Sequence, residues 1–464
     1  MKTFDFAVIG AGVVGSAITR ELTKYSDSVI CIESLDDVGA GTSKANTAIL
    51  HTGFDMTPGT VESKLVAKGY HLLRKYASES GIAVEETGAI LVAWNQVEAD
   101  EIPKILNKAV SNGYQECKIL TAEEVYAREP HLGPGVECGL LVPGEFIIDP
   151  WSVSLAFATQ AKRAGATLAL NTEVTSIKSR DGIFEIGTTQ GSYTAKFIVN
   201  AAGLFSDVID QFLGYSELKI TPRRGELIVF DKFSRSLLSH IILPVPTAMG
   251  KGVLVSPTIF GNTMLGPTAV DIEDKSDRRT TESGFKYLTD KAKIIFPELL
   301  NEEVTATYVG LRAASHQSEY FIESREKASY ITVGGIRSTG LTASLAIAEY
   351  VIELMKDSGI VFADAREHPP IHMPNLGEAF TRPYRSEAMI SQNADYGKII
   401  CHCEKASLGE IKDALESDIP PTSISSLGRR TRACLGRCQG FYCEATLREI
   451  LQSQANESQL SKQA

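Results

Sequence analysis

The sequence predicts an α/β protein of several domains, and three observations support this. The chain has 464 residues, more than one hydrophobic core usually accommodates, so two or three domains are expected. A glycine-rich turn, "GAGVVG", stands near the N-terminus between a strand-like and a helix-like segment. Five of the eight cysteines lie between residues 401 and 443, which indicates a separate small module at the C-terminal end.

Charge and hydropathy exclude some classes of function. The formal net charge of −11 argues against nucleic-acid binding, because phosphate backbones are bound mainly through Lys and Arg. The sequence contains no secretory signal pattern, no apolar run long enough to span a bilayer and no basic amphipathic anchor. We therefore expect a cytoplasmic protein with no direct membrane span, held at a membrane only if a partner subunit recruits it.

The N-terminal segment predicts a dinucleotide site. Residues 4–9 form a short apolar run typical of a strand, and Gly10, Gly12 and Gly15 follow at once. These glycines suit a tight turn, close approach of a pyrophosphate and close packing of a helix on a strand. The next strand-like run contains Glu33, whose carboxylate could accept hydrogen bonds from an adenosine ribose. Either NAD or FAD would satisfy this pattern.

Three further segments favour FAD. They are the small-residue loop "GAGTSKANTAILHTGF", the strand and turn "FIVNAAGLFSDVI", and the strand, glycine turn and helix "YITVGGIRSTGLTASLAIAEYV". Together they resemble the glutathione-reductase-like flavoproteins of the D-amino acid oxidase superfamily, over about residues 1–360. The resemblance implies a discontinuous Rossmann-like FAD-binding domain (1–75, 149–214 and 321–360) and an inserted antiparallel-sheet substrate domain that caps the flavin (76–148 and 215–320).

The same resemblance implies which residues contact the cofactor. A helix that begins near Gly340 would place its N-terminus at the pyrimidine edge of the flavin, where it would stabilise negative charge. Beyond the glycine turn and Glu33, the expected contacts are Thr42, Ser43, Asn46, Thr47, Val174, Ala202, Gly203, Gly335, Thr339, Gly340, Leu341 and Thr342.

Two histidines are candidates for the catalytic base. Oxidation of a carbinol requires a group that takes the hydroxyl proton, and histidine is the commonest choice near neutral pH. His51 directly follows the small-residue loop, and His316 lies just beyond the strand that contains Arg312. The sequence does not separate these two.

Arg312 is the candidate for binding a small anionic substrate. In related flavoenzymes an arginine at this position pairs with the anionic group of the substrate, and a guanidinium fork suits a carboxylate or a phosphate. Arg223, Arg224 and Arg337 could serve the same purpose or could equally be solvated surface residues.

The C-terminal cysteines predict a metal site. Cys401 and Cys403 precede an amphipathic helix, and Cys438 and Cys443 follow it, so that a short fold-back could bring four thiolates to zinc or to a 2Fe-2S cluster. This stretch resembles the bacterioferritin-associated-ferredoxin-like 2Fe-2S domain, particularly the copy found in anaerobic glycerol-3-phosphate dehydrogenases. The resemblance makes those four residues the ligands, with zinc as the alternative, whereas Cys434 stands where glycine is usual.

The module also suggests a domain division and an electron path. We expect a linker over residues 361–396, the 2Fe-2S domain over 397–455 and a tail over 456–464. Nearby arginines, Arg429, Arg430, Arg432 and Arg437, could offset the thiolate charge, remain solvated or form a docking face for an acidic partner. A cluster gives a two-electron flavin a one-electron outlet, so an electron-acceptor protein or a quinone-reducing partner subunit is expected.

These features imply an FAD-dependent dehydrogenase for a small anionic secondary alcohol. The cluster module favours sn-glycerol 3-phosphate, oxidised to dihydroxyacetone phosphate, whereas "HTGFDMTPGT" and "RRGE" are similar to L-2-hydroxyglutarate dehydrogenases. Two alternatives remain open: an amine or imino-acid dehydrogenase, and a non-catalytic electron-transfer subunit that retains FAD.

Overall fold

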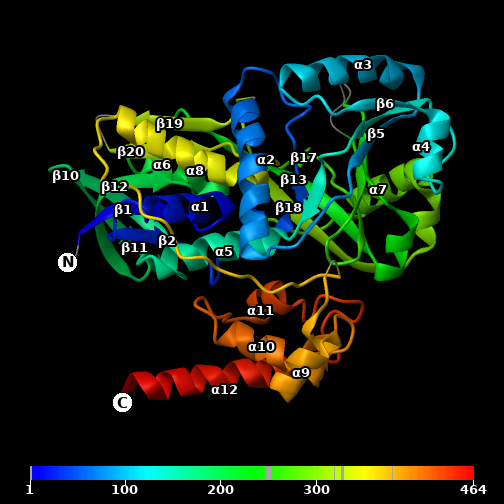
Figure 1. The fold of residues 1–464 in the computed structure, drawn as a ribbon. Helices are drawn as coiled ribbons and strands as arrows, with labels where there is room; N and C mark the ends of the chain where they lie inside the picture. The colour runs from blue at the N-terminus through cyan, green and yellow to red at the C-terminus, as the bar shows by residue number, and fades with distance from the viewer. Residues whose placement is uncertain (1–2, 247–251, 318, 326–328, 379, 464) are drawn as a thin grey trace.

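The computed structural model describes residues 3–246, 252–317, 319–325, 329–378 and 380–463. Figure 1 shows a large body built around two sheets and a small C-terminal domain that lies against one side of it. The chain passes from the first sheet to the second and back twice before it enters the small domain.

The first sheet is mixed and has eight strands. Parallel strands form its centre: β1 lies between β2 and β12, β9 continues beyond β2, and β20 pairs with the end of β12. Antiparallel strands β10, β11 and β19 extend it. Its strands are β1 (Thr3–Ile9), β2 (Val29–Ile32), β9 (Thr167–Ala169), β10 (Val174–Arg180), β11 (Ile183–Thr188), β12 (Gly191–Asn200), β19 (Phe321–Arg325) and β20 (Tyr330–Gly334).

Both faces of this sheet are covered, as expected for an apolar parallel centre. On β1, Phe6 and Val8 belong to the core formed with the helices, whereas Ala7 and Ile9 belong to the core under β10 and β11. This alternation follows from the two-residue period of a strand. The helices of this part are α1 (Val13–Leu22), α2 (Val61–Ser80), α5 (Pro150–Arg163), α6 (Ser206–Gln211) and α8 (Gly340–Asp357).

The second sheet has nine strands and is antiparallel except where β5 pairs with β14. Its strands come from two separate stretches of chain, 89–142 and 220–315, and its longest pair is β13 with β18, which pairs with no other strand among the described residues. The elements are β5 (Ala89–Ala93), β6 (Lys118–Thr121), β7 (Cys138–Val142), β13 (Ile220–Phe230), β14 (Ile241–Pro244), β15 (Leu254–Pro257), β16 (Thr263–Gly266), β17 (Val270–Asp271) and β18 (Val304–Ser315), with helices α3 (Gln96–Ser111), α4 (Ala122–Arg128) and α7 (Glu282–Ile295).

Short elements join the two large sheets. A three-stranded sheet brings together segments that are far apart in the sequence. It contains β3 (Ile49–Leu50), β4 (Val84–Glu85) and β8 (Phe146–Ile148), and the 3-10 helices of the large body are η1 (Thr42–Ala45), η2 (Gly203–Phe205), η3 (Lys232–Leu237) and η4 (Pro297–Asn301).

The C-terminal domain has its own small core, which includes Ile411, Leu427 and Leu447. Its helices differ from the expected division, because residues 383–397 of the expected linker form short helices that pack beside α10. The last helix also continues through residues 456–463, where a tail was expected. The elements are η6 (Pro383–Arg385), α9 (Glu387–Gln392), η7 (Ala394–Gly397), β21 (Ile399–Cys401), β22 (Ala406–Ser407), α10 (Leu408–Leu415), α11 (Ile424–Thr431) and α12 (Glu444–Gln463).

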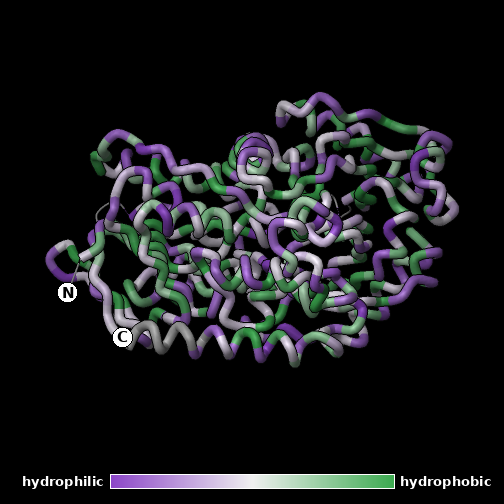
Figure 2. Tube along the Cα trace, turned by 60° about the horizontal axis from the view of Figure 1, so that its bottom comes forward, coloured by the Kyte–Doolittle hydropathy of each residue, from purple (hydrophilic) through white to green (hydrophobic). Residues whose placement is uncertain are grey.

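Hydropathy follows this architecture. Figure 2 shows hydrophobic segments concentrated in the interior strands and hydrophilic segments along the outer loops and helices. Within the described ranges, no helix is both long and apolar enough to cross a membrane.

Candidate functional site

A cavity of about 380 Å³ is lined by residues of both large sheets. Most of the residues expected to contact the cofactor lie on its wall, although they come from five separate parts of the chain. These residues are Gly10, Gly12, Gly15, Glu33, Thr42, Ser43, Asn46, Thr47, Ala202, Gly203, Thr339, Gly340 and Leu341.

The glycine turn at the start of α1 leaves the backbone open to a ligand. Gly10 has φ +101°, and a Cβ added there would lie 2.6 Å from the carbonyl oxygen of Ala201. A Cβ on Gly15 would lie 1.9 Å from the carbonyl oxygen of Gly10, so only glycine permits this packing of helix on strand. The N-cap residue of α1, Gly12, provides no side-chain cap, and the N–H of Val13 donates to the hydroxyl of Ser43 at 2.9 Å, so a bound phosphate could accept hydrogen bonds from the N–H groups that follow in the first turn.

Glu33 is held in place at the end of β2. Its carboxylate accepts hydrogen bonds from the N–H of Ala11 at 2.7 Å and from the N–H of Leu35 at 2.9 Å. Burial raises the pKa of this carboxyl group above its ordinary value. A carboxyl group fixed on the cavity wall beside a glycine turn suits the ribose of a dinucleotide.

Three expected cofactor contacts are absent from the residues that line the cavity. Val174 is buried at the start of β10, in the core beneath the sheet. Gly335, with φ +64°, forms the turn after β20, and the neighbouring Gly334 and Ile336 reach the wall instead. The hydroxyl of Thr342 accepts a hydrogen bond from the N–H of His51 at 3.0 Å, so this residue supports the wall from behind.

His51 and Glu145 form a pair at the cavity. Nδ1 of His51 lies 2.8 Å from Oε2 of Glu145, whose side chain is fully buried. The other carboxylate oxygen accepts hydrogen bonds from the N–H of Thr52 at 2.6 Å and from its hydroxyl at 2.8 Å. A carboxylate on one ring nitrogen fixes the orientation of an imidazole, so that the second nitrogen can exchange protons.

Sequence reasoning missed Glu145. It lies 94 residues from His51, in the stretch "LLVPGEFIIDP". The available signal was an acid within an apolar run, because a buried carboxylate requires a partner. His316, the other candidate base, is exposed and is absent from the residues that line the cavity.

Arg312 lies on the cavity wall and is partly buried. Its Nη2 donates to the carbonyl oxygen of Thr268 at 2.5 Å, and its buried Nε has no hydrogen-bond partner. Burial and the charge of neighbouring Arg223 lower the pKa of Arg312 to about 10, so the guanidinium stays charged at neutral pH. Among the described residues no carboxylate forms an ion pair with it, which leaves this cation available to an anion in the cavity.

The other three arginines considered for the substrate each have a carboxylate partner. Arg223 binds Asp271 through two nitrogens, at 2.6 and 3.0 Å. Arg224 binds Asp277 at 2.5 Å, and Arg337 binds Glu62 at 2.9 Å. Their charges are therefore already offset within the protein.

The C-terminal cysteines lie close together in two pairs. Cys401 lies close enough to Cys443, and Cys403 close enough to Cys438, for each thiol to influence the pKa of the other, and Cys434 also contacts Cys443. Among the described residues, these cysteines included, no group of three or more His, Cys, Asp or Glu side chains could hold a single metal ion. Two pairs of cysteines match the chemistry of a two-iron cluster, in which four thiolates serve two irons.

The loop after Cys438 favours a thiolate. Burial acts to raise the pKa of Cys438, but the N–H groups of residues 440–442 and the Cys403 thiol outweigh it and hold that pKa below its ordinary value. Cys434 has φ +66°, as suits a position where glycine is usual, and its Sγ lies 3.6 Å from that of Cys443. The donor set therefore fits an iron-sulfur cluster.

The arginines near the cysteines hold the C-terminal domain against the large body. Arg430 of α11 binds both oxygens of Asp37 at 2.8 Å, and Arg429 binds the same carboxylate at 2.5 Å. Burial acts to raise the pKa of Asp37, but these two arginines outweigh it and hold the pKa below its usual value. These contacts support a docking role for Arg429 and Arg430. The acidic partner is Asp37 of the protein's own large body and not a separate protein.

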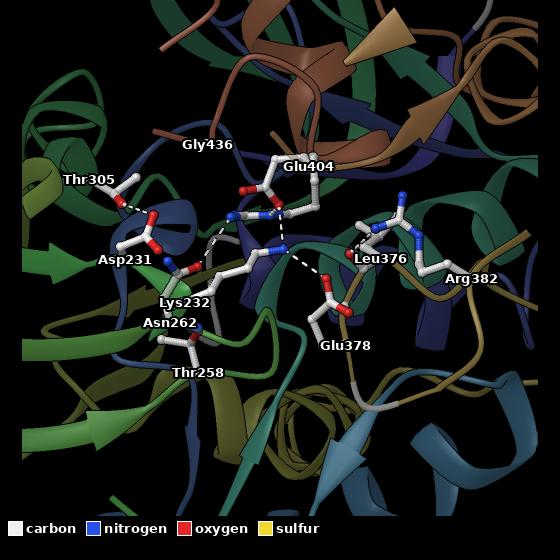
Figure 3. Close-up of polar contacts among 12 residues, drawn as sticks. Asp231, Lys232, Thr258, Asn262, Thr305, Leu376, Glu378, Arg382, Glu404 and Gly436 are labelled. Carbon is white, nitrogen blue, oxygen red and sulfur yellow. Dashed lines mark hydrogen bonds and ion pairs between the residues drawn. The ribbon is translucent and has the colours of Figure 1, made fainter. Parts of the chain in front are cut away.

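A second group of ion pairs crosses the same interface. Lys232 lies between Glu378 and Glu404, at 2.8 and 3.3 Å (Figure 3). Arg432 also binds Glu404, at 3.2 Å, and Arg437 binds Asp231 at 3.2 Å. Glu404 is next to Cys403, so this group fixes the cysteine loop relative to the second sheet.

Family models match both parts of the chain. A model described as FAD dependent oxidoreductase matches residues 5–354, and one described as BFD-like [2Fe-2S] binding domain matches residues 399–453. These matches confirm the expected FAD and 2Fe-2S cofactors and set the zinc alternative aside.

Individual relatives give the same picture. A glycerol 3-phosphate dehydrogenase of Caloramator mitchellensis is 35% identical over 97% of this chain and 94% of its own length. The mitochondrial L-2-hydroxyglutarate dehydrogenase of Bos taurus is 28% identical over 58% of this chain and 61% of its own. The structure of reduced L-alpha-glycerophosphate oxidase from Mycoplasma pneumoniae, with FAD bound, superimposes with a TM-score of 0.76 at 29% identity and covers 81% of this chain and 100% of that one. This likeness confirms the expected FAD-binding fold with its antiparallel substrate sheet.

Proposed function

The chain belongs to the FAD-dependent oxidoreductase family, and from this premise we propose that it is a dehydrogenase that oxidises sn-glycerol 3-phosphate to dihydroxyacetone phosphate. The observation that carries the proposal is the placement of Arg312, which no carboxylate of the described residues pairs with, on the same cavity wall as the His51–Glu145 pair. Oxidation of an anionic alcohol needs a cation that binds its charged end and a base that takes its hydroxyl proton.

Arg312 would hold the anionic end of the substrate. Its Nε is buried and lacks a hydrogen-bond partner, so a phosphate or carboxylate oxygen could satisfy a donor that is costly to leave unpaired. The fork geometry of a guanidinium also restrains the orientation of the anion, and this positions the carbinol at the other end.

His51 would take the hydroxyl proton. Glu145 fixes Nδ1, so Nε2 is the atom that would accept the proton, and the buried carboxylate would stabilise the imidazolium that forms. When bound, FAD supplies the acceptor for the hydride that leaves the carbinol carbon.

The start of α8 would offset negative charge beside the substrate. Gly340 and Leu341 are on the cavity wall, and no side chain caps this helix. Its free N–H groups and positive dipole end favour an anion there. Thr339, which precedes the helix, is held by a hydrogen bond from its hydroxyl to Glu62 at 2.8 Å.

The 2Fe-2S domain would provide the route by which electrons leave. Cys401, Cys403, Cys438 and Cys443 are the residues that would hold the cluster. A one-electron carrier suits transfer to an acceptor protein or to a quinone-reducing partner subunit.

L-2-hydroxyglutarate dehydrogenase is a second candidate function. Relatives with that name match 58% of this chain, and the substrate is also an anionic secondary alcohol. A carboxylate would satisfy Arg312 as well as a phosphate would.

Anaerobic visible spectroscopy of the purified holoenzyme separates these functions. sn-Glycerol 3-phosphate and L-2-hydroxyglutarate are added to separate samples, and the flavin band is followed with time. We expect fast bleaching by glycerol 3-phosphate alone. Bleaching by L-2-hydroxyglutarate alone would establish the second candidate, and bleaching by neither in a protein that dithionite reduces would refute both.

A further inference from the structure

An aromatic pair lies at the interface between the cavity and the cysteine domain. Trp151, in the first turn of α5, stacks on Phe260 with ring centroids 4.8 Å apart and an interplanar angle of 23°. Phe260 lies in the turn between β15 and β16, so the pair joins the FAD-binding part of the chain to the second sheet.

On its inner side this pair is continuous with the cavity wall. Nε1 of Trp151 donates to the carbonyl oxygen of Lys44 at 3.1 Å, within η1, whose neighbouring residues line the cavity. Both rings belong to an apolar cluster that also contains the wall residues Phe54 and Leu91. The rings and these wall residues thus form one continuous apolar cluster.

On its outer side the pair is covered by the cysteine loop. The guanidinium of Arg432 lies 4.3 Å from the ring centroid of Phe260 and 5.4 Å from that of Trp151. Arg432 is buried, two residues before Cys434, and it binds Glu404, which follows Cys403. Figure 3 shows the surrounding contacts of Glu404 with Lys232, which hold this loop in place.

We propose that Trp151 and Phe260, under Arg432, form the electron-transfer bridge between the flavin and the 2Fe-2S cluster. This inference rests on one part of the proposed function, namely that electrons leave the flavin through the cluster. The reduced flavin loses two electrons and a proton in total. Each electron passes singly across the rings and reduces the cluster by one electron, and a one-electron acceptor reoxidises the cluster before the second electron follows. The rings provide a packed path and are not themselves oxidised.

The position of Arg432 also holds the two rings against the cysteine loop. A cation over the faces of two rings is stabilised by their quadrupoles and in turn holds them against the loop. Together with the Asp37 pairs of α11, this contact keeps the two cofactor sites at a constant separation, so no domain movement is needed between electron transfers.

The test uses the dithionite-reduced holoenzyme, freed of excess reductant and mixed anaerobically with ferricyanide in a stopped-flow instrument. This measurement requires no substrate, so a wrong substrate assignment would leave it unaffected. Recovery of the flavin band reports electron flow from flavin through cluster to acceptor. Cys438→Ser, which lacks the cluster, measures any direct oxidation of the flavin by ferricyanide.

Trp151→Leu removes the ring and its N–H, and Trp151→Phe keeps a ring for stacking. We expect flavin recovery to be slower in Trp151→Leu than in the wild type, and to slow less in Trp151→Phe, which keeps a ring. Trp94, the chain's other tryptophan, packs in the core of the second sheet, and Trp94→Phe is the matched control with unchanged recovery.

Two results would overturn the proposal. One is a wild-type rate of flavin recovery in Trp151→Leu. The other is slow recovery accompanied by faster proteolysis of residues 361–382 or by a shifted midpoint potential of either cofactor, since the ring would then act only by holding the domains or tuning the cofactors.

Discussion

Replacing Glu145 by Gln tests the proposed base most directly, because it changes charge and hydrogen bonding with little change of shape. The carbonyl oxygen of the new amide can still accept from the N–H and hydroxyl of Thr52, which lie 2.6 and 2.8 Å from the native oxygen. Its NH₂ group must then face Nδ1 of His51. Because an NH₂ group only donates, Nδ1 must accept, and the ring proton moves to Nε2.

The magnitude follows from this exchange of tautomers. An imidazole protonated on Nε2 cannot accept the substrate proton there, so the contribution of a general base, about 10²–10⁴ in rate, is lost. This corresponds to about 2.7–5.5 kcal/mol of transition-state stabilisation. The amide-for-acid change in a Ser-His-Asp triad acts in the same way and costs about 10⁴.

The assay is the rate of flavin bleaching at saturating substrate, measured by anaerobic stopped flow, together with Tm. Glu129→Gln is the matched control, because Glu129 is another buried carboxylate paired with a histidine, His240 Nδ1 at 2.7 Å, and is absent from the cavity lining. Each variant should lose about 1.5–3 kcal/mol of stability, as expected for a buried hydrogen bond to a charge. A Glu145→Gln enzyme that bleaches as fast as Glu129→Gln would refute the proposed role.

Three further outcomes are expected. Arg312→Ala should raise the KM of the anionic substrate by about 10- to 150-fold. This factor is the equivalent of one charge-assisted hydrogen bond of about 1.5–3 kcal/mol. Arg223→Ala removes an arginine that is already paired and should leave the KM near that of wild type. Cys438→Ser should lose the iron and acid-labile sulfide while retaining FAD, and Cys117→Ser, at a half-buried cysteine outside the module, should keep both; equal iron content in the two variants would contradict the ligand assignment. Because the folded pKa of Asp37 lies below its usual value of 3.8, its contribution to docking is present above that value and is lost as the pH falls through the lowered pKa. Cleavage of residues 361–382 by an acid-active protease should therefore accelerate only in that acidic range, and Asp37→Asn should be cleaved quickly by trypsin at neutral pH.

Much of the cavity wall could be anticipated from the sequence, because the residues that form it are determined locally. Gly10 and Gly15 are required by contacts within one strand–turn–helix unit, and Glu33 ends the next strand of the same unit. Val174 and Gly335 were expected contacts as well, but a contact made through the backbone carries no side-chain signature. Neither residue lines the cavity.

The arginines show where prediction from sequence fails. Arg223, Arg224 and Arg312 lie on two paired strands, and Arg223 is directly opposite Arg312 in the register. Only the structure reveals that Arg223 and Arg224 have carboxylate partners some fifty residues away, Asp271 and Asp277, and that no carboxylate pairs with Arg312 among the described residues.

By itself, the sequence determined the parts of this protein: an FAD-binding unit, an inserted sheet and a four-cysteine module. The glycine turn and the cysteine spacing are local patterns, whereas the choice of FAD, the inserted sheet and the four ligands were implied by resemblance to known families. Only the tertiary structure decided which parts meet. Glu145 reaches His51 across 94 residues and Arg430 reaches Asp37 across 393, because chain topology alone brings such residues together. The proposed role of His51 as base and the docking of the cysteine domain depend on those two contacts.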